Sequence, residues 1–180
     1  MKTVVGIDYS YTCPAVCVLS ETPRWFVHYK KDGKPYPDLP LVTWSRSTTT
    51  SEIPRFIELA AWVLDIVTVV QPDFVVLEDY AFGAAGRLTQ LSENAGTLKV
   101  KLYEHYPQLP LHVVAPTTMK KFATGRGIAT KDDIWAAFIK RWPDYAEWAK
   151  LCHPKSLRVG SPVADIADSY FLADYGQQHY

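Results

Sequence analysis

Four acidic residues in this chain have the types and spacing of a metal site. Asp8 and Glu78 each follow a short apolar segment, and Asp165 and Asp168 stand three residues apart in a sequence with helical spacing, so that they share one helix face. Carboxylates are ligands that Mg²⁺ prefers. Two metal ions about 3.5–4 Å apart can stabilise the attacking and leaving oxygens of phosphodiester hydrolysis. The four acids therefore predict metal-dependent cleavage of phosphodiester bonds.

Each acid also has an ordinary structural explanation. Asp8 could be a turn residue, Glu78 could be solvated beside Asp79, and Asp165 could interact with the dipole of its own helix. Asp168 fits such an explanation less well because apolar residues surround it. Singly, most of these acids favour the structural explanation. Together, at matching ends of the predicted elements, they favour a metal site.

The elements that must position these acids are predicted from hydrophobic periodicity. Segments with strand-like patterns are residues 3–7, 15–19, 24–29, 41–46, 74–77 and 111–114. Lys31-Asp32-Gly33 is a hairpin signal, and residues 41–46 are predicted to be the third strand of an antiparallel meander. The wholly apolar segment 74–77 comes after a helix. It is therefore predicted to pair in parallel with the first strand, which places Asp8 and Glu78 at one sheet edge.

Helices are predicted at residues 51–70 and 88–106. Two more are predicted to begin after Thr130 and after Ser161, because both of these residues are suitable N-caps. In the first helix, one apolar face is predicted to be buried: Ile53, Phe56, Ile57, Ala60, Ala61, Leu64 and Val67. This order predicts an α/β ribonuclease-H-like fold. Its five-stranded mixed sheet would have three antiparallel strands followed by parallel strands, with helices on both faces. The whole chain, residues 1–180, is predicted to be one domain.

Composition limits the class of protein. No segment is apolar for the roughly 20 residues that a membrane helix needs, and an acid at position 8 is too early for a secretion signal. We therefore expect a cytoplasmic protein with no membrane partner. The 3 cysteines are expected to be reduced and buried rather than zinc ligands. The formal net charge of zero is the main objection to a nucleic-acid enzyme, because phosphate binding usually requires a basic surface.

Several motifs resemble those of RuvC Holliday-junction resolvases. Residues 5–10 (Val-Gly-Ile-Asp-Tyr-Ser), 76–79 (Val-Leu-Glu-Asp) and 163–169 (Val-Ala-Asp-Ile-Ala-Asp-Ser) are similar to the acidic motifs of the family. The most specific stretch is 115–131, where Pro, Lys-Lys, Thr-Gly-x-Gly and Ala-x-Lys follow at the family's spacing. Residues 91–96 resemble a family helix start more loosely. The motifs extend over nearly the whole chain in the family's order.

The resemblance implies a crossover junction endodeoxyribonuclease of DNA recombination and repair. Such a homodimer binds a four-way junction and makes paired nicks, and activated water leaves a 5′ phosphate. Asp8, Glu78, Asp165 and Asp168 would hold Mg²⁺, for which Mn²⁺ substitutes. Lys120 and Lys131 would lie near the cleaved strand, where a cation can stabilise the charged transition state. Lys121 and Arg126 would extend the DNA-binding face, although Lys121 could also be an ordinary exposed lysine.

The chain departs from the family pattern in three respects. It is neutral rather than basic, and residues 30–40 are longer than a minimal hairpin. Where the family has an aromatic residue three positions past the second acid, this chain has Ala81, between Tyr80 and Phe82. These departures are what a divergent member would show, for example one encoded by a phage.

Other functions compete with junction resolution. A nuclease of the same fold could act on flaps, forks or RNA–DNA hybrids, and a junction-binding protein could have lost the chemistry. An actin-like ATPase needs two related halves, for which 180 residues are too few. Five aromatic residues near helical spacing are predicted to form core or dimer contacts rather than a DNA-stacking surface: Trp135, Phe138, Trp142, Tyr145 and Trp148.

Overall fold

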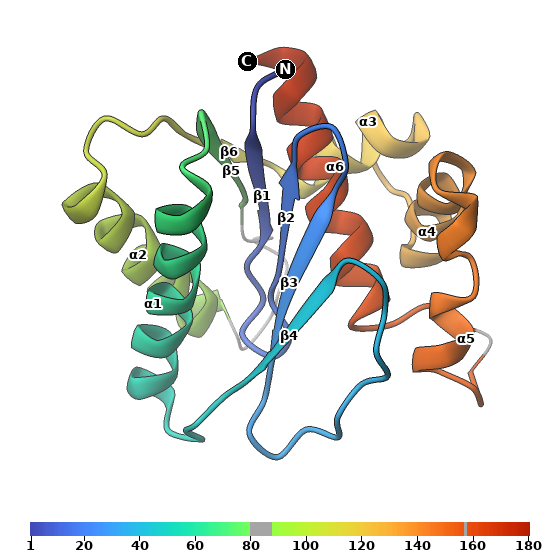
Figure 1. Ribbon diagram of the computed structural model, residues 1–180, viewed down its shortest axis with the longest axis horizontal. Coiled ribbons are helices and arrows are strands. Elements are labelled where there is room, and N and C mark those ends of the chain that lie inside the picture. Colours follow the sequence, from blue (N-terminus) through green and yellow to red (C-terminus); the bar gives the residue numbers. More distant parts are fainter. Residues whose placement is uncertain (80–87, 157) are drawn as a thin grey trace.

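The computed structural model of the chain describes residues 1–79, 88–156 and 158–180. A six-stranded sheet in the order β4-β3-β2-β1-β5-β6 forms its centre (Figure 1). The strands are β1 Val4–Asp8, β2 Ala15–Leu19, β3 Arg24–Tyr29, β4 Val42–Arg46, β5 Phe74–Glu78 and β6 Leu111–Val114. The helices are α1 Glu52–Val70, α2 Leu88–His105, α3 Pro116–Thr124, α4 Lys131–Arg141, the 3-10 turn η1 Pro143–Tyr145, α5 Trp148–Cys152 and α6 Val163–His179. The sequence also predicts a loop at Gly83–Gly86, and these residues lie outside those described.

The predicted α/β mixed sheet is confirmed, with one correction. β1, β2 and β3 pair antiparallel, and β5 pairs parallel with both β1 and β6, as expected. The sheet has six strands rather than five, since all six segments with strand-like patterns join it. β4 was expected as a strand of the antiparallel meander, but it pairs parallel with β3 at the edge of the sheet. The prediction of an antiparallel hairpin at Lys31-Asp32-Gly33 was therefore wrong.

The physical reason lies in the segment between β3 and β4. The amide of Gly33 donates to the Lys30 carbonyl at 3.0 Å, so the chain does turn at the expected place. Three prolines follow within residues 34–40. Proline has no amide hydrogen to donate to a strand ladder, and the segment instead runs back along β3 until the Leu41 carbonyl accepts from the Trp25 amide at 2.8 Å. β4 then starts level with Trp25 and runs in the same direction as β3.

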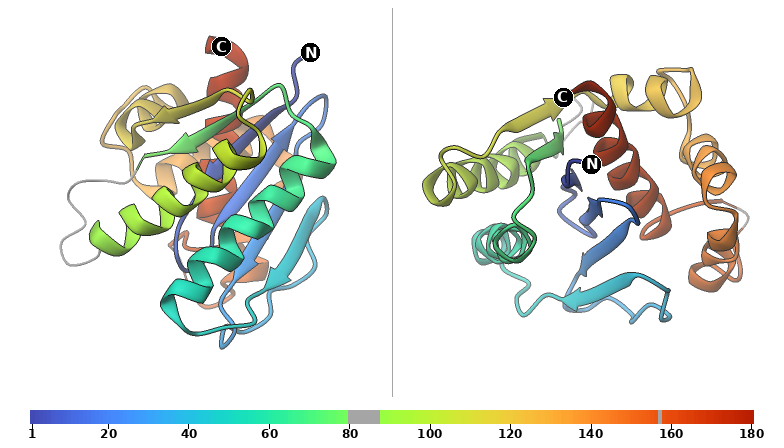
Figure 2. Two further views of the ribbon diagram at one scale, coloured as in Figure 1. Left: turned by 90° about the vertical axis from the view of Figure 1, so that its left-hand side faces the viewer. Right: turned by 45° about the horizontal axis from the view of Figure 1, so that its top comes forward.

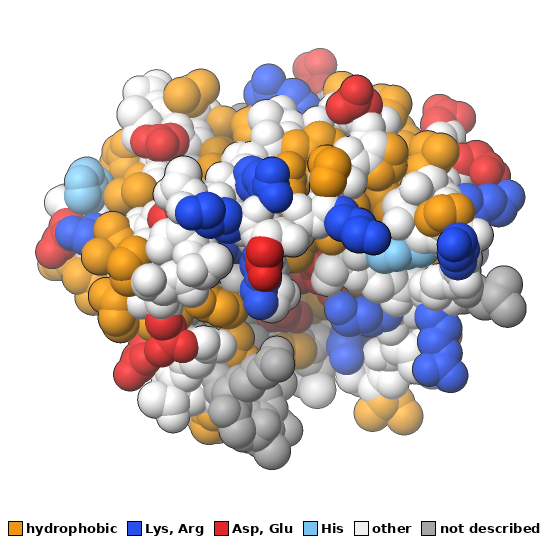
Figure 3. Space-filling model, turned by 90° about the horizontal axis from the view of Figure 1, so that it is seen from below, with side chains coloured by type: hydrophobic (Ala, Val, Ile, Leu, Met, Phe, Trp, Pro, Cys, Tyr) orange, Lys and Arg blue, Asp and Glu red, His pale blue; other side chains and the backbone are white. Residues whose placement is uncertain are grey.

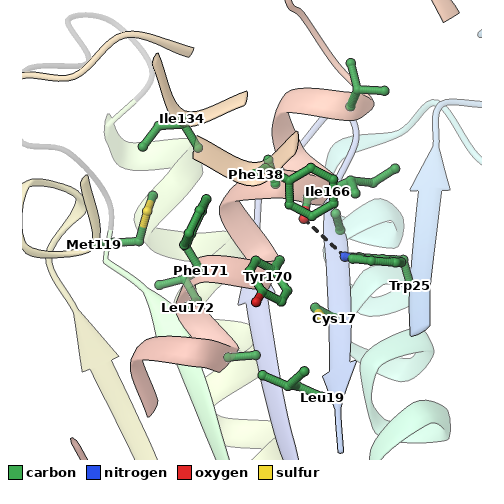
Figure 4. Packing of buried hydrophobic residues seen from close by; sticks show 14 of the residues in the cluster. Cys17, Leu19, Trp25, Met119, Ile134, Phe138, Ile166, Tyr170, Phe171 and Leu172 are labelled. Atoms are coloured by element: carbon green, nitrogen blue, oxygen red, sulfur yellow. Dashed lines mark hydrogen bonds between the residues drawn. The ribbon is translucent and has the colours of Figure 1, made fainter. Parts of the chain in front are cut away.

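Helices cover both faces of the sheet, as predicted. α1 and α2 lie on one face, and α6 lies on the other, backed by α3, α4 and α5 (Figures 1 and 2). Each face has its own hydrophobic cluster. In the cluster around α6, the indole of Trp25 donates to the Ile166 carbonyl at 3.2 Å, and Phe138 and Tyr170 pack nearby (Figure 4). Trp135, Phe138 and Trp148 are buried, and Trp142 and Tyr145 pack against them, which agrees with the predicted core role.

Two local predictions on helices need correction. On α1, Ile53 and Ile57 are 59% and 55% exposed, because the buried face is rotated and carries Arg55 in its first turns. At the start of α6, the N-cap position is taken by Pro162 rather than Ser161, and no side chain caps the helix. The predicted N-cap of Thr130 is confirmed, with Asp133 completing a reciprocal capping box.

The remaining composition-based expectations concern cysteines and membrane spans. Cys13 and Cys17 are free and buried, and Cys152 is free and half-buried. Within the described residues, no helix combines the length and hydropathy that membrane crossing requires.

α6 approaches the sheet closely because two glycines lie at the contact. A Cβ on Gly6 of β1 would stand 2.3 Å from the Ser169 carbonyl oxygen and 2.4 Å from the Ala173 nitrogen. At Gly176 of α6, a Cβ would stand 2.5 Å from a methyl carbon of Val76 on β5. Because Gly176 lies near Val4 while Ser169 lies near Gly6, α6 runs antiparallel to β1. Its first turns therefore lie at the carboxyl end of β1.

We predict that Gly6→Ala destabilises the fold by several kcal/mol, since backbone atoms of α6 cannot move aside as a flexible side chain can, and overpacking alone costs about 1–3 kcal/mol. Urea denaturation without metal measures the change in the free energy of unfolding. Gly96→Ala in α2 is the matched control, because no atom of residues 1–79, 88–156 or 158–180 lies within 4 Å of the added Cβ. It should leave stability unchanged or raise it by up to about 1 kcal/mol. Equal stability of the two variants would contradict the close approach.

Candidate active site

The four predicted acids meet at the carboxyl end of β1. Ile7 of β1 pairs with Leu77 of β5 in parallel register, so the next residues, Asp8 and Glu78, follow on adjacent strands. The antiparallel course of α6 brings Asp165 and Asp168 to the same place. All four line one cavity of about 300 Å³. This is the arrangement that the sequence predicted from strand ends and helix spacing.

Two of the predicted lysines line the same cavity. Lys120 comes from α3, and Lys131 is the first residue of α4, so all six residues come from five different elements. The remaining lining residues are Tyr9, Ser10, Asp79, Leu91, Ala95, Pro116 and Ile134. Figure 3 shows this end of the molecule, where Lys and Arg side chains gather around a hollow with acidic side chains at its floor.

Burial and mutual repulsion raise the pKa values of the four carboxyl groups and so disfavour their simultaneous ionisation. Burial, then the charges of Asp165 and Glu78, raise the pKa of Asp8 well above its ordinary value. Burial and the charge of Asp168 raise the pKa of Glu78 to about 8. Burial and the charge of Asp165 raise the pKa of Asp168 to about 7. Burial also raises the pKa of Asp165, with partial offset from Ser161 and Lys131. The positive charge in the cavity is therefore too small to keep all four carboxylates ionised at neutral pH.

The lysines supply part of that charge. Lys131 Nζ lies 3.7 Å from Asp165 Oδ1. Although burial lowers the pKa of Lys131, the four carboxylates outweigh burial and raise it, so the ammonium stays charged. The charge of Lys120 lowers the pKa of Glu78 and of Asp168. Two lysines still face four carboxylates, and the excess of negative charge favours a further cation.

Comparison with known proteins identifies the fold. No protein-family model matches the sequence, and neither does any curated protein. Among solved structures, Thermus thermophilus RuvC in complex with a Holliday junction substrate matches with a TM-score of 0.62 at 17% identity, over 99% of this chain and 96% of that one. The chain has the RuvC fold. The yeast mitochondrial Holliday junction resolvase Ydc2 matches with a TM-score of 0.53 at 17% identity, over 96% of this chain and 76% of that one. A fowlpox virus resolvase with its Holliday junction DNA also gives 0.53, at 15% identity, over 98% and 97%.

Within this RuvC fold, the cavity suits a hard divalent cation. The Oδ2 atom of Asp165 is buried and has no hydrogen-bond partner in the part of the chain that is described. The four acids offer only carboxylate oxygens, as Mg²⁺ prefers. In the described part of the chain, no three His, Cys, Asp or Glu side chains already form a closed ligand cage. A metal ion would therefore have to draw the carboxylates inward, and its attraction for them would offset their mutual repulsion.

Two other predicted site residues lie elsewhere. Lys121 lines a separate cavity with Phe122, Tyr175 and His179. Arg126 forms an ion pair with Asp133 at 2.9 Å. Lys121 lies away from the acids because residues 116–124 form α3. Adjacent side chains on a helix point about 100° apart, so Lys120 and Lys121 cannot both face the acids. The sequence did not predict this helix.

Some lining residues were missed. Ser10 and Asp79 each lie close in sequence to a predicted acid, and their adjacency was the signal that could have placed them at the cavity. Leu91 and Ala95 show that the start of α2 forms one wall. Ala81 and its neighbours Tyr80 and Phe82, where the family has an aromatic residue, lie outside the described residues.

The raised pKa values lead to a prediction on stability. An unfolded chain releases the Asp168 proton near pH 4, whereas the folded protein holds it up to a pKa of about 7. Metal-free stability should therefore fall as pH rises from about 4 to 8. Asp168→Asn should raise the metal-free Tm at pH 8 by a few degrees, since each kcal/mol is worth about 2–4 °C at this size. At pH 5 the difference should nearly vanish.

Thermal melts in EDTA at the two pH values measure this effect. Asp65→Asn, an exposed carboxylate on α1, is the matched control and should show no such pH-dependent gain. An Asp168→Asn variant that is less stable than wild type at pH 8 would show that the carboxylates do not repel one another in the folded protein.

Proposed function

We propose that this protein is a metal-dependent, structure-specific DNA endonuclease that resolves Holliday junctions by paired nicking, as one nuclease domain over residues 1–180. The observation that carries the proposal is the convergence of Asp8, Glu78, Asp165 and Asp168 in one cavity with Lys120 and Lys131. The fold supports it, because two of the similar structures are described as complexes of a resolvase or RuvC with Holliday junction DNA.

In the proposed mechanism, the four carboxylates hold Mg²⁺, or Mn²⁺ in its place. Bound metal ions would supply the charge that activates water and stabilises the leaving oxygen. Lys131 holds its ammonium 3.7 Å from Asp165, and Lys120 lines the same cavity, where its charge lowers the pKa of Glu78 and Asp168. Both lysines can neutralise a phosphate that enters the cavity and stabilise the added charge of the transition state.

Paired nicking requires two active sites, so we propose a homodimer. Apolar side chains that a monomer leaves in water support this proposal. Ile53 and Ile57 on α1 and Val100 and Tyr103 on α2 are exposed. α1 and α2 lie side by side on the same face of the sheet (Figure 2). This exposed apolar surface is the best candidate for the contact between two copies.

Two alternatives remain within the same fold. A nuclease with broader selectivity would use the same carboxylates on flaps and forks. A non-catalytic junction-binding protein would have no use for four buried acids whose mutual repulsion destabilises the fold. The intact acidic cavity therefore favours an enzyme over a binding protein.

We predict that Asp8→Asn, Glu78→Gln, Asp165→Asn and Asp168→Asn each abolish cutting while junction binding changes by less than about threefold. The acids hold the metal rather than the DNA, which explains the separation. A gel assay with Mg²⁺ or Mn²⁺ on an immobile four-way junction, a flap, a fork and a linear duplex measures both properties.

The pattern of products distinguishes the alternatives. Symmetric nicks in the junction alone support a resolvase, whereas equal cutting of flaps and forks supports a broader branched-DNA nuclease. Tight junction binding without cutting by the wild-type protein would support the binding protein and overturn the proposed chemistry.

A second prediction separates the lysines that the sequence grouped together. Lys131→Ala should lower the rate of junction cutting by about 10²–10³-fold, because it removes a positive charge next to the reacting phosphate. Lys121→Ala is the matched control. Its side chain lines a different cavity, so the single-turnover rate should stay within about threefold of wild type. Equal losses in both variants would place the cut strand differently from our proposal.

A further inference from the structure

A second, smaller cavity lies beside the loop that follows Asp8. Its volume is about 120 Å³, and it is lined by Tyr11, Lys30, Lys31, Thr49, Thr50 and Arg55. The one acid in its lining is Asp32. At roughly 30 Å³ per water molecule, the cavity has room for about four waters. A phosphate group fits within that space.

Arg55 is the buried cation of this cavity. Only 2% of its side chain is exposed, although arginine is almost never so buried unless it is well paired. Its Nη1 lies 3.4 Å from Glu58 Oε2, and its Nη2 donates to the Tyr11 carbonyl, also at 3.4 Å. Ordinary charge-assisted bonds are about 2.7–2.9 Å long. Arg55 Nε is buried and has no hydrogen-bond partner among the described residues, so the guanidinium is incompletely satisfied.

Glu58 cannot satisfy Arg55 alone because other donors share its carboxylate. It accepts from the hydroxyl of Ser47, from the Thr48 amide at 2.6 Å and from the Thr48 hydroxyl at 2.7 Å. His28 Nε2 also lies 3.6 Å from Glu58 Oε2. Much of the carboxylate's hydrogen-bonding capacity is thus directed away from the cavity, and Arg55 retains positive charge toward its other side.

Further groups at the cavity also favour an anion. Lys30 and Lys31 are exposed, and Lys30 Nζ lies 5.8 Å from the centroid of the Tyr11 ring. Thr49 and Thr50 precede α1, whose N-cap residue Ser51 makes no side-chain capping bond. The positive end of the helix dipole therefore adds to three cationic side chains. Two acids reduce this positive potential. Asp32 lines the cavity, and Glu52 lies in the first turn of α1, where it accepts a hydrogen bond from Gln90.

We propose that this cavity binds one phosphate of the DNA backbone, close to the strand that is cut. The inference rests on the proposed function. Tyr11 lies three residues after Asp8, and the bond from Arg55 to the Tyr11 carbonyl ties the cavity to the active-site loop. A phosphate seated on Arg55 and the two lysines would fix where the strand crosses Asp8. The segment after β3, whose length the sequence left unexplained, supplies both lysines.

The test compares pairs of variants in the full-length chain. Lys30→Ala/Lys31→Ala should weaken binding of a four-way junction in EDTA by about tenfold at 0.1 M salt. It should also reduce the slope of log affinity against log salt by about 1–2, because one or two phosphate contacts are lost. Asp32→Asn removes the opposing charge and should tighten binding by about two- to fivefold. Fluorescence anisotropy over a salt series measures both.

The matched control removes two lysines at the other end of the sheet. Lys2 precedes β1, and Lys101 lies near the end of α2, where Tyr106 and Thr68 join the last turns of α2 and α1. Lys2→Ala/Lys101→Ala should leave affinity within about twofold and the salt slope unchanged. If the two double variants behave alike, the cavity does not bind phosphate and the proposal is overturned.

Ethylation of single phosphates locates the contact. Ethylating one or two phosphates near the cut site should block binding by the wild-type protein and by the Lys2→Ala/Lys101→Ala variant. The same ethylations should have little effect on Lys30→Ala/Lys31→Ala, which has already lost that contact. An identical interference pattern for all three proteins would overturn the proposal. A wild-type protein that neither binds nor cuts branched DNA would instead overturn the proposed function.

Discussion

The close contact between α6 and β1 is the constraint on which the candidate site depends. With hydrogen in place of a side chain at Gly6, the backbone of α6 lies directly on the strand. Further along α6, Gly176 allows the helix to lie equally close to Val76 of β5. The two contacts fix the height and direction of the helix, so that Asp165 and Asp168 reach the level of Asp8. A helix displaced outward by one side-chain thickness would carry both acids away from the strand ends.

The site concentrates negative charge, and the surrounding surface compensates for it. Two lysines from α3 and α4 reach the acidic cavity, and cationic side chains gather around its rim (Figure 3). This distribution answers the objection raised by a net charge of zero. What matters for phosphate binding is the local potential at one end of the sheet rather than the sum over the chain. Acidic residues elsewhere balance the total without altering that surface.

The sequence predicted most of the sheet and the meeting point of the acids, because both depend on local patterns that burial enforces. An apolar strand that ends in an acid, or two acids three apart on a helix, can be recognised from neighbouring residues alone. The parallel pairing of β4 could not be predicted in this way. It depends on where the chain returns after the turn at Gly33, and no local pattern records that path. The exposure of Ile53 and Ile57 was not predicted, because the buried face of α1 carries the charged Arg55, which pairs with the half-buried Glu58.

The placement of α6 has a consequence for how the protein folds. β1 and α6 lie near opposite ends of the sequence, yet they form one of the closest contacts in the core. Contacts between distant segments close late, because the chain must first lose the entropy of the long loop between them. The sheet of β1, β2 and β3 can form from local contacts, but Asp165 and Asp168 join Asp8 only when α6 docks. A partly folded chain therefore carries the acids separately, and the complete charge cluster is a property of the finished fold alone.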